Sequence, residues 1–283
     1  MDNPTEKAAS IFIKLFLISV FTLPLFSTSV EAKTFKVDCT KGNQTIQKAL
    51  NKTGLRDGDE IEVSGNCVEN IQIRRDHIIL RGTNGATITA ADTAEPAIVV
   101  QGVDVRIFNF GSISDGANGI ALRRSASANI DGNTIESNTG VGINVNTSSS
   151  ARLTNNVIQN NGASGVQVTG ASAQIFSNII VSNGVNGIQV QEAGSAEVDN
   201  NTITDNTVNG IRVRRTSHIA LSGNLNFGQP NVLLRNGAFG VRCNLNSSVE
   251  DPVGQTYGAG ADANGDGDFQ VTTGCSAEGA GFL

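Results

Sequence analysis

Apolar and polar residues alternate in short runs along the middle of the chain, and the runs recur at a nearly fixed distance. A glycine opens each run, with spacings of 23, 23, 22, 23 and 30 residues: Gly119, Gly142, Gly165, Gly187, Gly210 and Gly240. Spacings of 23, 22, 23 and 23 separate the asparagines Asn133, Asn156, Asn178, Asn201 and Asn224. An apolar column shares those spacings: Ile130, Leu153, Ile175, Val198 and Leu221. Each column has one 22-residue step, and it falls in the same repeat in all of them. The columns therefore predict a tandem repeat of about 23 residues.

Each repeat contains three short strand patterns. In the first strand every second residue is apolar and is expected to point inward: Ile120, Ile143, Val166, Ile188, Ile211 and Val241. The residues that follow them form the outward column: Ala121, Asn144, Gln167, Gln189, Arg212 and Arg242. The second strand has an Ala-x-Ile pattern. A two-residue bend then carries the asparagine column, whose amides can hydrogen-bond from coil to coil. The sequence therefore predicts stacked coils with identical positions about 4.8 Å apart.

The motif Asn-x-Ile-x-x-Asn-x-x-x-Gly-Ile-x-Val resembles the right-handed parallel β-helix repeat of the pectin-lyase-like superfamily, over residues 58–246. Residues 45–50 resemble the family's entry segment, which implies a short N-terminal capping helix that buries Ile46, Ala49 and Leu50. The expected fold is an all-β, right-handed parallel β-helix of three-strand coils. The expected organisation is an N-terminal cap at 33–57, repeats at 58–246 and a C-terminal cap or tail at 247–283.

The catalytic motifs of polygalacturonases, pectate lyases and pectin methylesterases are absent from the sequence. An epimerase-type site would need a Tyr, a His and an Asp together, and Tyr257 is expected to lie outside the repeats. His77 and His218 are interpreted as structural or solvent-facing. This fold carries many unrelated activities, so the resemblance alone assigns no catalytic residue.

The outward face of the first strand is the best candidate for a binding surface. Arginine and glutamate residues gather there: Arg212, Arg214, Arg215, Arg242, Glu192 and, at the other end, Arg123. Guanidinium groups bind carboxylate or sulfate groups through two parallel hydrogen bonds, which suits an acidic polysaccharide. The alternative is an ordinary solvated strand face, because Asn144, Gln167 and Gln189 share the column.

The sequence favours a carbohydrate-directed protein, either similar to a polysaccharide lyase or glycan-binding. The alternative is a non-catalytic structural or adhesive solenoid. A net charge of −6 argues against a nucleic-acid partner. The 30-residue spacing before Gly240 indicates an inserted loop that contains residues 227–230.

The N-terminus has the three regions of a secretory signal peptide. Lys7 and Lys14 precede an apolar run at 15–26, and small residues at Val30 and Ala32 suit cleavage after Ala32. The run is short for a membrane span, and no later segment approaches that length. We therefore expect residues 1–32 to be removed and the protein to be secreted or periplasmic, without stable membrane insertion.

Four cysteines allow three disulfide connectivities. Pairing within each end, Cys39 with Cys67 and Cys243 with Cys275, is favoured because the coil stack separates the two ends by tens of ångströms, far beyond the reach of a disulfide. Four free thiols are the alternative, which export disfavours.

A stretch near the C-terminus resembles a calcium loop. Its oxygen-bearing residues occupy alternate positions: Asp262, Asn264, Asp266 and Asp268. The bidentate Glu of such loops is replaced by Thr273, so the match is partial. Calcium is the one cofactor that the sequence suggests, and an ordinary acidic turn is the alternative.

Overall fold

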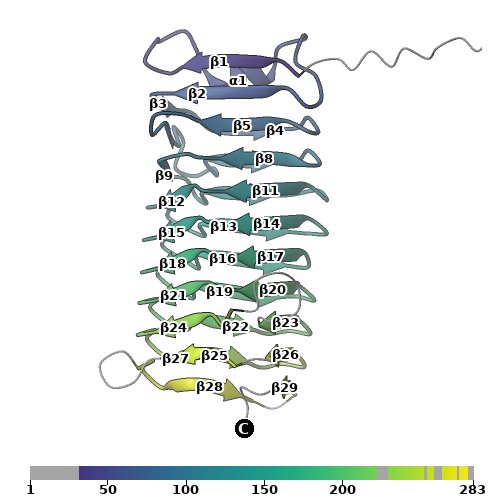
Figure 1. The fold of residues 1–283 in the computed structure, drawn as a ribbon, viewed down its shortest axis with the longest axis vertical. Coiled ribbons are helices and arrows are strands. Elements are labelled where there is room, and N and C mark those ends of the chain that lie inside the picture. Colours follow the sequence, from purple (N-terminus) through teal and green to yellow (C-terminus); the bar gives the residue numbers. More distant parts are fainter. Residues whose placement is uncertain (1–31, 222–228, 252–253, 258–262, 273, 280–283) are drawn as a thin grey trace, which may run out of the picture. The chain divides into compact units, whose positions relative to one another are not determined.

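A computed structural model describes residues 32–221, 229–251, 254–257, 263–272 and 274–279 of the chain. Their strands form three parallel sheets of 9, 11 and 9 strands, and successive coils add one strand to each sheet (Figure 1). We name the sheets by the order of their strands within the repeat. The described part of the chain is thus an all-β parallel solenoid with almost no helix.

The first-strand sheet contains β4 (Ile71–Ile73), β7 (Ile98–Val100), β10 (Ile120–Leu122), β13 (Ile143–Asn146), β16 (Val166–Thr169), β19 (Ile188–Gln191), β22 (Ile211–Val213), β25 (Phe239–Cys243) and β28 (Gly267–Val271). The second-strand sheet contains β1 (Thr34–Asp38), β2 (Glu60–Ser64), β5 (Ile79–Gly82), β8 (Val105–Phe108), β11 (Ser127–Asp131), β14 (Ser150–Thr154), β17 (Ser172–Phe176), β20 (Ser195–Asp199), β23 (His218–Leu221), β26 (Ser248–Asp251) and β29 (Ser276–Gly279). The third-strand sheet contains β3 (Asn66–Val68), β6 (Thr87–Thr89), β9 (Ser112–Ser114), β12 (Thr134–Glu136), β15 (Val157–Gln159), β18 (Ile179–Val181), β21 (Thr202–Thr204), β24 (Val232–Leu234) and β27 (Thr256–Tyr257).

The inward column expected for the first strand is confirmed. Ile143 pairs with Val166, and Val166 pairs with Ile188 on the next coil. All three side chains are fully buried. Because a strand alternates its side chains between two faces, this register also fixes which residues of the same strands point outward.

Two asparagine ladders connect the coils. The first follows the bend between the second and third strands, where each side-chain amide donates to the Oδ1 atom of the next asparagine at 2.8–3.2 Å: Asn133, Asn156, Asn178, Asn201 and Asn231. The second lies where the third strand turns toward the next coil: Asn138, Asn161, Asn183, Asn206, Asn236 and Asn264. These buried amides satisfy backbone groups at both corners.

The repeated glycine is required by close packing at the second ladder. A Cβ atom on Gly187 would lie 2.4 Å from Ile203 Cγ2, 2.7 Å from the Gly210 carbonyl oxygen and 2.9 Å from Asn206 Nδ2. Any larger side chain would therefore push the neighbouring coil away.

The inserted residues change one member of the first ladder. Asn231, and not the expected Asn224, accepts the hydrogen bond from Asn201. The step from Asn201 to Asn231 spans 30 residues, because extra residues lie between β23 and β24. Asn224 and residues 227–228 of the expected loop lie outside the described residues.

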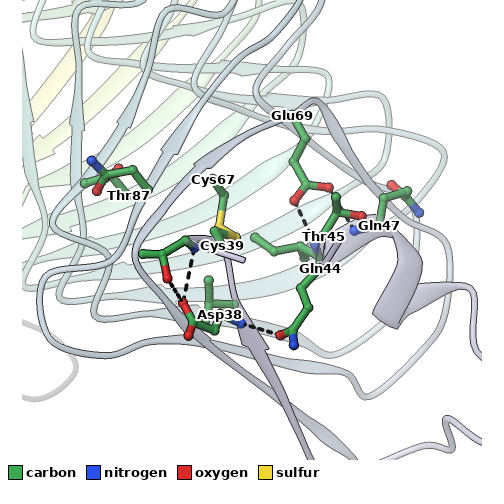
Figure 2. The surroundings of a disulfide bond; sticks show 12 residues. Asp38, Cys39, Gln44, Thr45, Gln47, Cys67, Glu69 and Thr87 are labelled. Atoms are coloured by element: carbon green, nitrogen blue, oxygen red, sulfur yellow. Dashed lines mark hydrogen bonds between the residues drawn. A yellow bond between two sulfur atoms is a disulfide. The ribbon is translucent and has the colours of Figure 1, made fainter. Parts of the chain in front are cut away.

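At the N-terminal end, the five-residue helix α1 (Ile46–Leu50) buries Ile46, Ala49 and Leu50. The Thr45 side chain accepts a hydrogen bond from the Lys48 N–H group. The Glu69 carboxylate accepts the N–H groups of Ile46 and Gln47 at 2.7 and 2.9 Å (Figure 2). Glu69 therefore fastens the start of the helix to the segment that follows β3.

Both expected disulfides are confirmed. Cys39 bonds to Cys67 beside the start of α1 (Figure 2), and Cys243 bonds to Cys275. Cys243 occupies the inward column and is fully buried. Each disulfide joins two segments at the same end of the stack, because the two ends are too far apart for a bond between them.

Strands also occupy the segments expected to form the cap and the tail. β1 precedes residue 58, and β26 to β29 continue all three sheets beyond residue 246. Tyr257, expected outside the repeats, pairs with Leu233 in the third-strand sheet. Residues 1–31 lie outside the described part, and with them the expected signal peptide except for Ala32. Among the described helices, none has the length and apolar character needed to cross a membrane.

Candidate functional site

The arginines expected on the first-strand face converge in two neighbouring coils. Arg212 of β22 pairs in register with Arg242 of β25, and Arg242 pairs with Gln270 of β28. Adjacent parallel strands place the Cα atoms of such partners about 4.8 Å apart. We call Arg212, Arg214 and Arg242 the arginine cluster.

Arg212 and Arg242 have no hydrogen-bonded or ion-paired partner among the described residues. Their Nε atoms are buried and unpaired. Burial lowers the pKa of Arg212 below its usual value, and the positive charges of Arg214, Arg242 and Arg215 add to this effect. The Arg242 guanidinium lies 5.8 Å from the centroid of the Phe239 ring, a cation–π distance. The two arginines are therefore held together without a neutralising group.

Buried amides hold the third member of the cluster. The Arg214 Nε atom donates to Gln191 Oε1 at 2.9 Å. The same oxygen accepts from Gln189 Nε2 at 2.9 Å, and Gln189 in turn accepts from Asn186. Burial lowers the pKa of Arg214, as does the positive charge of Arg215. Gln189 is only 6% exposed, so the outward column is buried at this coil.

The other residues expected on this surface lie at its edge or outside it. Arg215 forms a salt bridge with Glu192 in the turn that follows the first strand. Arg123 follows β10, which is four coils from β22 and therefore about 19 Å along the stack. Arg123 does not join the cluster.

The sequence pattern did not reveal the residues that support the cluster. From the sequence, Gln189 was interpreted only as an uncharged member of the outward column. In the structure it belongs to the network of side-chain amides with Asn186 and Gln191. Asn186 and Phe239 lie outside that column. Asn186 precedes the repeated glycine, and this position was the available signal for the network.

The candidate calcium residues have other contacts where they are described. Asn264 ends the second asparagine ladder and donates to Asp268 Oδ1 at 3.2 Å. Asp266 is exposed, and Asp262 lies outside the described residues. In the part of the chain that the structure describes, Cys39, Cys67 and Glu69 form the one cluster of metal-type ligands, and its cysteines are bonded to each other. Calcium binding by the tail stays a prediction.

The histidines and Tyr257 lie away from the arginine cluster. His218 Nδ1 is 2.8 Å from Ser248 Oγ on the second-strand sheet, and His77 lies 3.7 Å from Asp57. Tyr257 projects toward Gly240 inside the coil, where a Cβ atom would meet its ring at 2.7 Å. Burial, together with the charges of Asp251 and Asp268, raises the pKa of the Tyr257 hydroxyl. The arginine cluster, in which the Nε atoms of Arg212 and Arg242 are unpaired, has the chemistry of an anion-binding surface.

Solved structures of similar fold include proteins that are named for alginate. The chain is 15% identical to one mutant of the periplasmic alginate epimerase AlgG, with a TM-score of 0.51 over 86% of this chain and 82% of that chain. A second mutant has 17% identity and a TM-score of 0.53 over 87% and 66% of the two chains. An alginate lyase from Paenibacillus sp. str. FPU-7 has 16% identity and a TM-score of 0.50 over 83% and 99%. At these identities the likeness concerns the fold.

A search of curated protein sequences finds no match to the chain. The family model described as "Right handed beta helix region" matches residues 51–203 and, in a second overlapping alignment, residues 118–273. These matches cover the asparagine ladders and the arginine cluster. The chain therefore belongs to the family of right-handed β-helix proteins.

Proposed function

We propose that the protein binds an acidic polysaccharide through the arginine cluster of the first-strand face. The observation that carries the proposal is the in-register pair of Arg212 and Arg242, which is partly buried and lacks an acidic partner among the described residues. Two like charges in this setting repel each other, and an anion bound between them would offset the repulsion. Uronate carboxylates have the planar geometry that guanidinium groups bind through paired hydrogen bonds.

The comparisons support the same class of ligand. The epimerase and the lyase that share this fold are named for alginate, which is an acidic polysaccharide. At these identities the likeness concerns the fold, and the arginine cluster itself supplies the chemical argument. Glu192 and Arg215 form the rim of the proposed surface, and Arg123 offers a separate contact farther along a long chain.

We propose roles for helix α1 and for residues 1–32 as well. Helix α1 packs against β1, β2 and β4 and serves as the N-terminal cap. Residues 1–32 direct export to the periplasm or the medium, where disulfides such as Cys39–Cys67 persist.

The proposal is tested by affinity electrophoresis in gels that contain alginate or polygalacturonate, with carboxyl-reduced forms of the same polymers as controls. We expect the acidic polymers to retard the protein more strongly than the reduced forms, and salt to weaken the retardation. Equal retardation by both forms would contradict the proposal. Incubation with the acidic polymers, followed by assay for unsaturated uronates, decides whether binding is accompanied by lyase activity.

A further inference from the structure

A groove lies on another face of the coil stack from the arginine cluster, on the outer surface of the second-strand sheet. It has a volume of about 510 Å³ and crosses the coils of β11, β14, β17 and β20. A ligand site of this size is usual for a small molecule or a short polymer segment. The groove shares none of its lining residues with the arginine cluster.

One row of the lining residues presents hydroxyl groups at regular intervals. Ser127, Ser150, Ser172 and Ser195 pair in register from strand to strand, so they repeat about every 4.8 Å. Ser127 Oγ accepts a hydrogen bond from the Asp104 N–H group at 2.7 Å. The hydroxyls of the other three are without a side-chain or backbone partner among the described residues, and these residues are exposed.

The neighbouring row, two residues further along the same strands and on the same outer face, is formed by amides and charged groups. Arg152 donates to Gln174 Oε1, and Gln174 donates to Glu197 Oε2, each at 3.0 Å. At the start of this row, the Oδ1 atom of Asn129 is buried and lacks a partner in the described structure. A buried acceptor of this kind is stabilised when a ligand supplies a donor.

The charges of the groove differ from those of the arginine cluster. Asp104 and Glu197 stand at its two ends, and Arg152 is the one cation of its lining. The lining therefore carries a net negative charge, which disfavours a polyanion. Free hydroxyls in one row and an unpaired acceptor in the neighbouring row suit a ligand that carries hydroxyl groups along its length.

We propose that this groove binds a neutral, extended polysaccharide, with sugar hydroxyls bonded to the row of serines and to Asn129. The groove and the arginine cluster then bind two kinds of glycan on two faces of one solenoid. Because their residues do not overlap, either site can fail while the other is retained.

The test is calorimetric titration of the purified protein with three neutral β-1,4-linked hexasaccharides, cellohexaose, xylohexaose and mannohexaose. We expect at least one to bind. The Ser172→Trp change places a large side chain in the groove and should weaken that binding at least tenfold. Thr202→Trp is the matched control on the third-strand sheet and should leave the affinity unchanged.

A milder variant and an acidic ligand complete the design. Asn129→Ala removes the unpaired acceptor without filling the groove and should weaken the neutral hexasaccharide several-fold, which keeps the test informative if Ser172→Trp fails to fold. Binding of an acidic hexauronate should be the same in wild type and Asn129→Ala. The inference is overturned if no neutral hexasaccharide binds at millimolar concentration, or if both groove variants bind it as the wild type does.

Discussion

Ile143 and Asn144 are neighbours on β13 with opposite surroundings. Ile143 is fully buried in the coil, whereas Asn144 points outward and is partly exposed. We predict that Ile143→Asn lowers the free energy of unfolding by about 3 kcal/mol or more, because it removes apolar packing and buries an unpaired amide. Asn144→Ala should change it by less than about 1 kcal/mol. Urea denaturation of both variants measures the difference, and equal midpoints would show that the assigned faces are incorrect.

Asn178 is a central member of the first ladder. Its side chain donates to the carbonyls of Leu153 and Phe176 and accepts the N–H group of Asn156. Asn178→Ala should therefore leave several buried groups unpaired and cost about 3 kcal/mol. Asn146→Ala is the control, because Asn146 is partly exposed and its side chain has no hydrogen bond among the described contacts. Thermal unfolding compares the two, and similar melting temperatures would refute a structural role for the ladder.

At the C-terminal end of the stack, the last coil has a neighbouring coil on one side only. The Cys243–Cys275 disulfide links β25 to the turn before β29 and closes a sequence separation of 32 residues. Loss of a bridge of this length typically costs roughly 3 kcal/mol. We predict that the double change Cys243→Ala and Cys275→Ala increases amide hydrogen exchange in β26, β28 and β29 while β13 and β16 stay protected. Uniform exchange along the stack would contradict this end-specific role.

At the level of the whole molecule, periodic apolar positions were sufficient to predict the fold. Ile143 and Ile188 occupy equivalent inward positions, because a parallel coil repeats its interior at every turn. The spacing of such positions is therefore enough to predict the coil. The disulfides followed from the same geometry. The ladder position of Asn231 did not, because Asn224 preserves the 23-residue spacing and the sequence alone does not show where the extra residues are inserted.

The candidate site was predicted less completely than the fold. The outward column correctly brought Arg212 and Arg242 together, because register places column neighbours side by side. It also placed Arg123 at the other end of the face, four coils from Arg212, but the column does not say how many coils a ligand spans. Nor did it show the burial of Gln189, which arises from contacts with Asn186 and Gln191.

The most direct test of the account is calorimetric titration of an acidic hexauronate into three forms of the protein. The account predicts that Arg212→Gln with Arg242→Gln weakens binding at least tenfold, which corresponds to about 1.4 kcal/mol, and reduces its dependence on salt. Arg106→Gln, which removes an exposed positive charge from β8 on the second-strand sheet, should bind as the wild type does. Equal affinity of all three forms would contradict the assignment of the arginine cluster as the glycan-binding surface.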